Sequence, residues 1–171
     1  LNPHYSHSWG YLIEPTLHDG LSASYQLSDN VGVTGLLANT LDSTSNGAIN
    51  GGERKTYGVA LNLSAPDSFG ALKGSTLDFA YLNGRASTAE SDTVQNIYLG
   101  ASVPLPVDKL SAGIAWDVRK ENGSGNTDNV MGLYLEYAAS DKLTLNGRVE
   151  RVEDGPANDL DSDAWDFTLT A

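Results

Sequence analysis

The feature that most constrains this fold is an alternation of apolar and polar residues with a period of two, repeated along most of the chain. It is clearest in residues 110–119, where apolar residues at even positions alternate with polar or small residues at odd positions. Successive side chains of a β-strand point to opposite faces of the sheet, so this period is typical of strands. No window of about a dozen residues combines helical spacing of apolar residues with a capping residue. The sequence therefore predicts an all-β fold.

We predict about ten antiparallel strands, each about 8–11 residues long, arranged as an up-and-down meander. The alternating segments are residues 5–13, 20–27, 31–40, 55–64, 74–84, 97–103, 110–119, 131–138, 143–150 and 165–170. The connections differ in length: 28–30, 104–108 and 140–142 are short, 65–73 is intermediate, and 41–52, 85–93, 120–128 and 154–162 are long. Short and long connections then fall at opposite ends of the sheet, and we expect a single domain over residues 1–171.

Composition excludes several classes of protein. Ten Lys and Arg against 22 Asp and Glu give a net charge of −12, so nucleic acid is not an expected partner. The absence of Cys excludes disulfides, thiolate metal sites and thiol catalysis. No apolar run approaches the length of a transmembrane helix, but a barrel strand needs only about 9–11 residues. Because the chain starts at Leu1 without a signal segment, we expect a mature or excised piece.

The two-residue period leaves open whether the apolar face points into a core or toward lipid. A soluble β-sandwich or lipocalin-like barrel, acting as a binding module, would turn Leu61, Ile114 and Leu145 inward. Long strands and the alternation of connection lengths instead favour a transmembrane β-barrel, or part of a larger one. The bulky aromatic residues near strand ends would form its interfacial girdle: Tyr25, Tyr57, Tyr81, Trp116, Tyr137 and Trp165.

The other face of the predicted strands carries charge. Its charged residues are Asp78, Asp117, Arg119, Glu136, Arg148, Glu150 and Asp166. If this face lines a water-filled lumen, the arginines oppose the carboxylates across it, and the excess of carboxylates favours cations. These residues can also pair across neighbouring strands, as Arg148 would with Glu136. The two interpretations are compatible.

Two patterns have the residue types of a metal site without its spacing. His4 and His7 lie three apart, which on a strand places them on opposite faces. Asp159, Asp161 and Asp163 have the spacing that begins a calcium loop, but neither its Gly nor its final Glu follows. We therefore expect no metal.

Enzymatic activity is not expected either. Nothing matches a Gly-x-Ser-x-Gly motif, and no Gly-rich phosphate loop with its following Lys is present. All three histidines lie in the first 18 residues, so an outer-membrane hydrolase would have to use His4, His7 or His18. The sequence indicates no cofactor.

Three stretches of the chain are similar to a known family. The segments NPHYSHSWGYLIEPTLHDGLSASY (2–25), GLLANT (35–40) and KTYG (55–58) resemble OmpL-like β-barrel porins of Gram-negative outer membranes. This resemblance implies a pore in the bacterial outer membrane, surrounded by its lipid, through which ions or small polar solutes diffuse passively. It also allows a homotrimer, an assembly common among porins. Family members are longer, and the terminal aromatic of outer-membrane barrels is missing, so we expect a fragment of a larger barrel.

Overall fold

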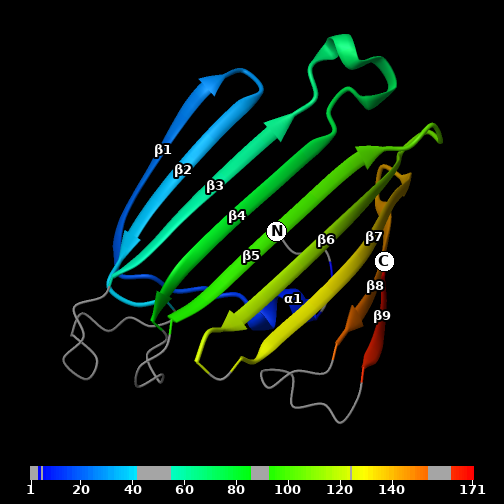
Figure 1. Ribbon diagram of the computed structural model, residues 1–171. Helices are drawn as coiled ribbons and strands as arrows, with labels where there is room; N and C mark the ends of the chain where they lie inside the picture. The colour runs from blue at the N-terminus through cyan, green and yellow to red at the C-terminus, as the bar shows by residue number, and fades with distance from the viewer. Residues whose placement is uncertain (1–3, 5, 42–54, 86–92, 124, 154–162) are drawn as a thin grey trace.

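In the computed structural model, the described residues form a single antiparallel sheet of nine strands that neighbour one another in sequence order (Figure 1). The structure describes residues 4, 6–41, 55–85, 93–123, 125–153 and 163–171. The strands are β1 (Gly20–Ser28), β2 (Val31–Ala38), β3 (Thr56–Ser64), β4 (Thr76–Arg85), β5 (Thr93–Pro104), β6 (Leu110–Glu121), β7 (Thr127–Ser140), β8 (Leu143–Val152) and β9 (Ala164–Thr170). The predicted all-β meander is confirmed.

The sheet is open, with β1 and β9 at its two edges, as expected of part of a barrel. It curls along its width, so that β8 and β9 turn away from the plane of β1 to β5 (Figure 1). In the part of the chain that the structure describes, no helix is both long and apolar enough to cross a membrane.

The first predicted strand is wrong. Residues Trp9–Ile13 form a short helix, α1, while Tyr5 lies outside the described residues. Ser8 caps this helix, because its hydroxyl accepts a hydrogen bond from the Tyr11 amide at 3.1 Å. Trp9 and Ile13 are four residues apart, so they share one side of α1 and pack together on the sheet.

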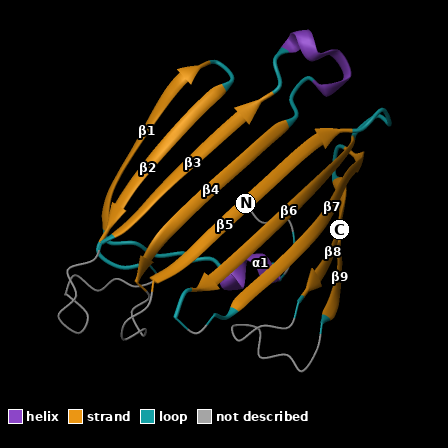
Figure 2. Cartoon of the chain, in the orientation of Figure 1, coloured by secondary structure: helices purple, strands orange, loops and turns teal. Residues whose placement is uncertain are grey.

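The connections also need one correction. At one end of the sheet the strands are joined by 29–30, 65–75, 105–109 and 141–142, and the second of these contains the 3₁₀ helix η1 (Asp67–Leu72; Figure 2). At the other end lie 39–55, 86–92, 122–126 and 153–163. The predicted long loop 120–128 is wrong, because β6 and β7 extend their pairing to Lys120 and Thr127. The asymmetry of connection lengths is therefore less regular than predicted.

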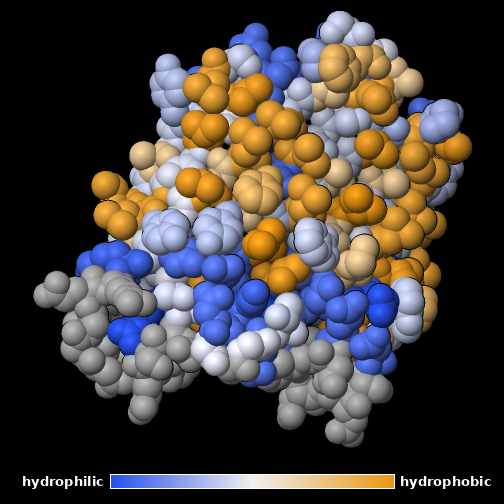
Figure 3. All heavy atoms as spheres, in the orientation of Figure 1, coloured by the Kyte–Doolittle hydropathy of each residue, from blue (hydrophilic) through white to orange (hydrophobic). Residues whose placement is uncertain are grey.

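Strand register sorts the side chains onto two faces. The inner face is the one that carries α1, which packs against β6 and β7; the outer face is the opposite one. A small core of buried apolar residues lies on the inner face, where Ile13 meets Val130 and Val152. Most large apolar side chains of the outer face are exposed, from Leu145 at 36% to Leu169 at 80%, and the others are half-buried. Figure 3 shows apolar residues over most of the strands, with hydrophilic ones beside the grey residues.

Candidate functional site

All seven charged residues predicted to share a face do lie on the inner face. The register runs in one row from Asp78 through Gly100, Ala115 and Gly132 to Glu150 and Asp166. The other four lie to either side of this row: Asp117 and Arg148 in the rows next to it, and Arg119 and Glu136 one row farther out. The structure does not bring all of them together, because they divide into a paired cluster on β8 and β9 and less paired groups on β4 to β7.

The paired cluster is centred on Arg148 and Glu150, two residues apart on β8. Arg148 Nε lies 3.0 Å from Glu150 Oε2, and both side chains are at most 2% exposed. The Nε–H does not point at an acceptor well enough to form a hydrogen bond, so this contact is an ion pair without one. A second carboxylate, that of Asp166, lies 3.5 Å from Arg148 Nη2. The predicted pairing of Arg148 with Glu136 is wrong, because the register places Asn146 opposite Glu136.

This cluster holds the N-terminal segment, defined here as residues 6–15, against the inner face. The carboxylate of Glu150 accepts the backbone N–H of Trp9 at 3.0 Å and that of Gly10 at 3.5 Å. Arg148 donates to the backbone carbonyl of Ser6 at 3.1 Å and to its hydroxyl at 2.9 Å. Side chains of both signs thus bind one short stretch of backbone.

Gly10 allows the closest approach of α1 to the sheet. A Cβ at this position would lie 2.9 Å from Asp117 Cγ and closer still to Oδ2. The Asp117 carboxyl is buried, at 5% exposure, and lies beside the carboxyl group of Glu14, which follows α1. A residue with a side chain at position 10 would push α1 away from this carboxyl pair.

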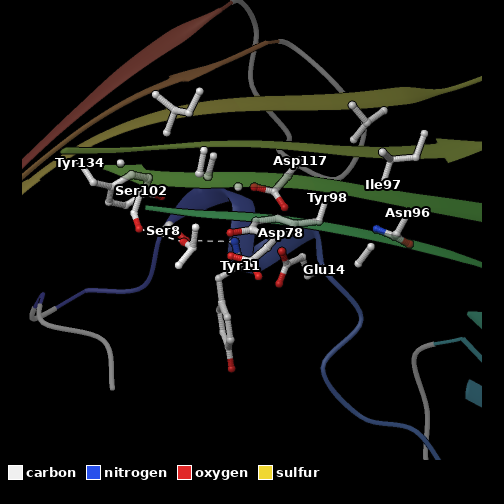
Figure 4. Close-up of a pocket in the computed structure, with 18 of the residues that line it drawn as sticks. Ser8, Tyr11, Glu14, Asp78, Asn96, Ile97, Tyr98, Ser102, Asp117 and Tyr134 are labelled. Carbon is white, nitrogen blue, oxygen red and sulfur yellow. Dashed lines mark hydrogen bonds between the residues drawn. The ribbon is translucent and has the colours of Figure 1, made fainter. Parts of the chain in front are cut away.

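Between the N-terminal segment and strands β4 to β6 lies a cavity of about 660 Å³. Figure 4 shows three carboxyl groups at this site: that of Glu14 from the N-terminal segment, and those of Asp78 and Asp117 from β4 and β6. Asn96 and Tyr98 of β5 also line the cavity. Asp78 accepts a hydrogen bond from Asn62 Nδ2 at 2.7 Å.

Three of these lining residues were not singled out from the sequence. Asn96 and Tyr98 lie just before and within the predicted strand 97–103, and their alternation with Ile97 and Leu99 is the signal that could have found them. Glu14 carried no such signal, because its place depends on how α1 packs.

The remaining charged residues of the inner face lie outside this cavity. Arg119 pairs with Glu121 on its own strand at 3.6 Å. Glu136 is exposed on β7. Within the described residues, Asp78, Asp117 and Glu136 form no ion pair with Lys or Arg.

The histidines occupy different surroundings. His4 is buried, with its ring 6.4 Å from that of Tyr134, whereas His7 is exposed and stacks on Tyr11 at 4.2 Å. Burial, together with the nearby Arg148 guanidinium, lowers the pKa of His4 below its usual value.

Two of the three aspartates of the candidate calcium loop, Asp159 and Asp161, lie outside the described residues. Among the residues that are described, no group of three or more His, Asp or Glu could hold a metal ion.

The six aromatic residues predicted as a girdle all project from the outer face, at different heights. Tyr57 and Trp165 are the second residues of their strands, and Tyr25 and Tyr137 lie three residues from the ends of theirs. The remaining two lie near the middle of β4 and β6: Tyr81 and Trp116.

Comparison with known proteins gives one match. A family model described as "Putative beta-barrel porin-2, OmpL-like" matches residues 1–171, which confirms the resemblance found in the sequence. No curated protein and no solved structure matches the chain.

Proposed function

Because the chain belongs to the OmpL-like family of β-barrel porins, we propose that it forms the wall of a water-filled channel in the bacterial outer membrane. Ions or small polar solutes would diffuse through it passively, and the protein would perform no chemistry of its own. The single observation that carries this proposal is the sorting of side chains by the sheet, with apolar residues on the outer face and charges on the inner one.

The outer face is suited to lipid. Soluble monomers rarely expose contiguous apolar patches larger than a few hundred Å². Here exposed Leu, Phe, Trp, Tyr, Val and Ile side chains recur on eight of the nine strands, with β5 the exception. A soluble β-sandwich or barrel would have to turn these residues inward, to the side that already carries α1 and the buried ion pair of Arg148 and Glu150.

The inner face is suited to water and to cations. The seven charged residues predicted for this face comprise five carboxylates and two arginines, and carboxylates that line a lumen attract cations and repel anions. Both arginines lie within 4 Å of a carboxylate, whereas Asp78, Asp117 and Glu136 have no such partner within the described residues. The proposed field in the lumen is therefore negative. A homotrimer in the outer membrane stays a prediction.

Labelling of single cysteines tests the orientation of the sheet, and the absence of native Cys makes each label unique. Leu133→Cys on the outer face and Glu136→Cys on the inner face lie on the same strand, three residues apart. With the full-length protein in lipid vesicles, brominated lipid should quench a fluorophore at position 133, and iodide should quench one at position 136. The reverse pattern, or folding without detergent or lipid, would support the soluble alternative.

Conductance tests the channel itself. The full-length protein should appear in the outer-membrane fraction as a heat-modifiable species and should conduct ions in a planar bilayer. Glu136→Gln combined with Asp166→Asn should lower the cation preference read from the reversal potential in a KCl gradient. An unchanged reversal potential would contradict the assignment of these residues to the lumen.

A further inference from the structure

The cavity under the N-terminal segment contains two buried acceptor atoms that have no hydrogen-bond partner among the described residues: Oδ1 of Asp117 and Oδ1 of Asn96. The two residues are 5% and 7% exposed, and both line the cavity. The amide of Asn96 is fixed in orientation, because its Nδ2 donates to the carbonyl of Ile13 at 3.0 Å. Leaving a buried acceptor unpaired costs about 1–3 kcal/mol, so two such atoms in one cavity call for a donor that both can share.

Both orphan atoms require a hydrogen-bond donor, and the carboxyl groups that line the cavity favour a positively charged one. Among the described residues that line it are three carboxyl groups, those of Glu14, Asp78 and Asp117, and no Lys, Arg or His. The carboxyl groups of Glu14 and Asp117 are close enough to hydrogen-bond, and two carboxylates at that separation repel unless a proton or a cation lies between them. Arg148, a cation of the same face, is already bound by Glu150 and Asp166.

The walls of the cavity favour an organic cation over a bare metal ion. Tyr98 lies across Gly100, and Tyr134 lies across Gly132, so closely that a Cβ on either glycine would be 2.7 Å from a ring carbon. The glycines thus let both rings lie along the sheet, where they line the cavity beside the carboxyl groups. Aromatic faces attract ammonium groups and also pack against alkyl carbon.

We propose that this cavity binds small organic cations that carry a primary ammonium group, and that it is the site at which the channel selects its solute. The ammonium group donates to Oδ1 of Asp117 and Oδ1 of Asn96, while Asp78 completes the negative surroundings. The volume of about 660 Å³ falls within the range of small-molecule sites, about 300–1,000 Å³. This inference rests on the proposed channel function, which it deepens by naming the class of solute.

The test uses n-butylammonium as the probe and 1-butanol as its neutral match. In planar bilayers containing the full-length protein, n-butylammonium should reduce the potassium current in a saturable way, and 1-butanol at equal concentration should not. Asp117→Asn should weaken this block about tenfold, because a hydrogen bond to a charged group is replaced by one to a neutral amide. Asp78→Asn, which removes a charge from a less buried position, should weaken the block severalfold.

The control variant is Glu136→Gln, which removes the same charge from the inner face outside the cavity. It should change the dissociation constant of the block by less than twofold. The proposal would be overturned if n-butylammonium blocked Asp117→Asn and Asp78→Asn as strongly as the unmodified protein, or if 1-butanol blocked as strongly as n-butylammonium. If Asp117→Asn does not fold, as judged by heat modifiability, Asp78→Asn decides alone.

Calorimetric titration of n-butylammonium into the micellar protein separates this proposal from the channel function. Binding without conductance would refute the channel but leave the site. Conductance without binding or block would refute the site but leave the channel.

Discussion

Replacing Glu150 by Gln should release the N-terminal segment from the sheet. Gln keeps the size of the side chain and one acceptor oxygen but removes the charge that serves both Arg148 and the backbone of α1. The carboxylate lies 3.0 Å from Arg148 Nε, and it accepts the Trp9 amide at 3.0 and 3.2 Å and the Gly10 amide at 3.5 Å. Because both charged side chains are at most 2% exposed, water cannot replace what is lost.

The magnitude follows from these contacts. Removing one partner of a buried ion pair costs about 3–5 kcal/mol, because the other charge stays buried and uncompensated. Arg148 keeps Asp166 at 3.5 Å, and Gln keeps one acceptor for α1, so the lower end applies. We expect the free energy of opening the N-terminal segment to fall by about 3 kcal/mol, which is about a hundredfold in the opening equilibrium.

Hydrogen exchange of the Trp9 and Gly10 amides, in protein folded into detergent micelles, measures this opening directly. Both amides should exchange about a hundredfold faster in Glu150→Gln. Glu136→Gln, on the exposed part of the same face, should leave them unchanged. The double variant Arg148→Met and Glu150→Leu removes both charges. It should destabilise the folded protein less than Glu150→Gln alone, since no buried charge is then left unpaired. Unchanged protection of Trp9 and Gly10 in Glu150→Gln would refute the reasoning.

Two further predictions concern the same segment. Gly10→Ala should displace α1, because the new Cβ overlaps the Asp117 carboxyl. We expect it to lower the stability of the segment by about 1–3 kcal/mol and to speed its proteolysis. Gly35→Ala, with no atom within 4 Å of its Cβ, should leave the cleavage rate unchanged, and equal rates in the two variants would contradict the packing described. Acidification should also loosen the N-terminal segment, which follows His4 in the chain. Burial and the nearby Arg148 lower the pKa of His4 in the folded protein. The contribution of His4 to stability is therefore full above its unfolded pKa of about 6.5, and it is lost as pH falls through that value toward the folded pKa. The protection factors of the Trp9 and Gly10 amides at pH 7.5 and pH 5 measure this loosening. An equal pH dependence of these factors in His4→Gln would show that another group is responsible.

Most of the sheet could be predicted because the alternation of side chains along a strand depends only on neighbouring residues in the chain. Alternation fixes which side chains share a face, and each of the seven charged and six aromatic residues lies on the face that its position predicted. The ends of the strands were less certain, as at 120–128, because pairing with a neighbour extends a strand beyond its alternating residues.

The N-terminal segment could not be predicted because its structure is decided by distant residues. Residues 5–13 alternate like a strand, yet Trp9–Ile13 fold as a helix of five residues, too short to be stable alone. The helix exists because Glu150, 140 residues away, binds its amides, and because Val130 and Val152 cover Ile13.

The sequence by itself thus determined nine of the ten predicted strands, their order and the chemistry of the two faces, since these depend on residues next to one another in the chain. Only the tertiary structure decided which charges pair and where the cavity lies. Arg148 meets Asp166 rather than Glu136 because of strand register. The cavity, with the orphan acceptors of Asp117 and Asn96, exists because α1 is held over strands far from it in sequence.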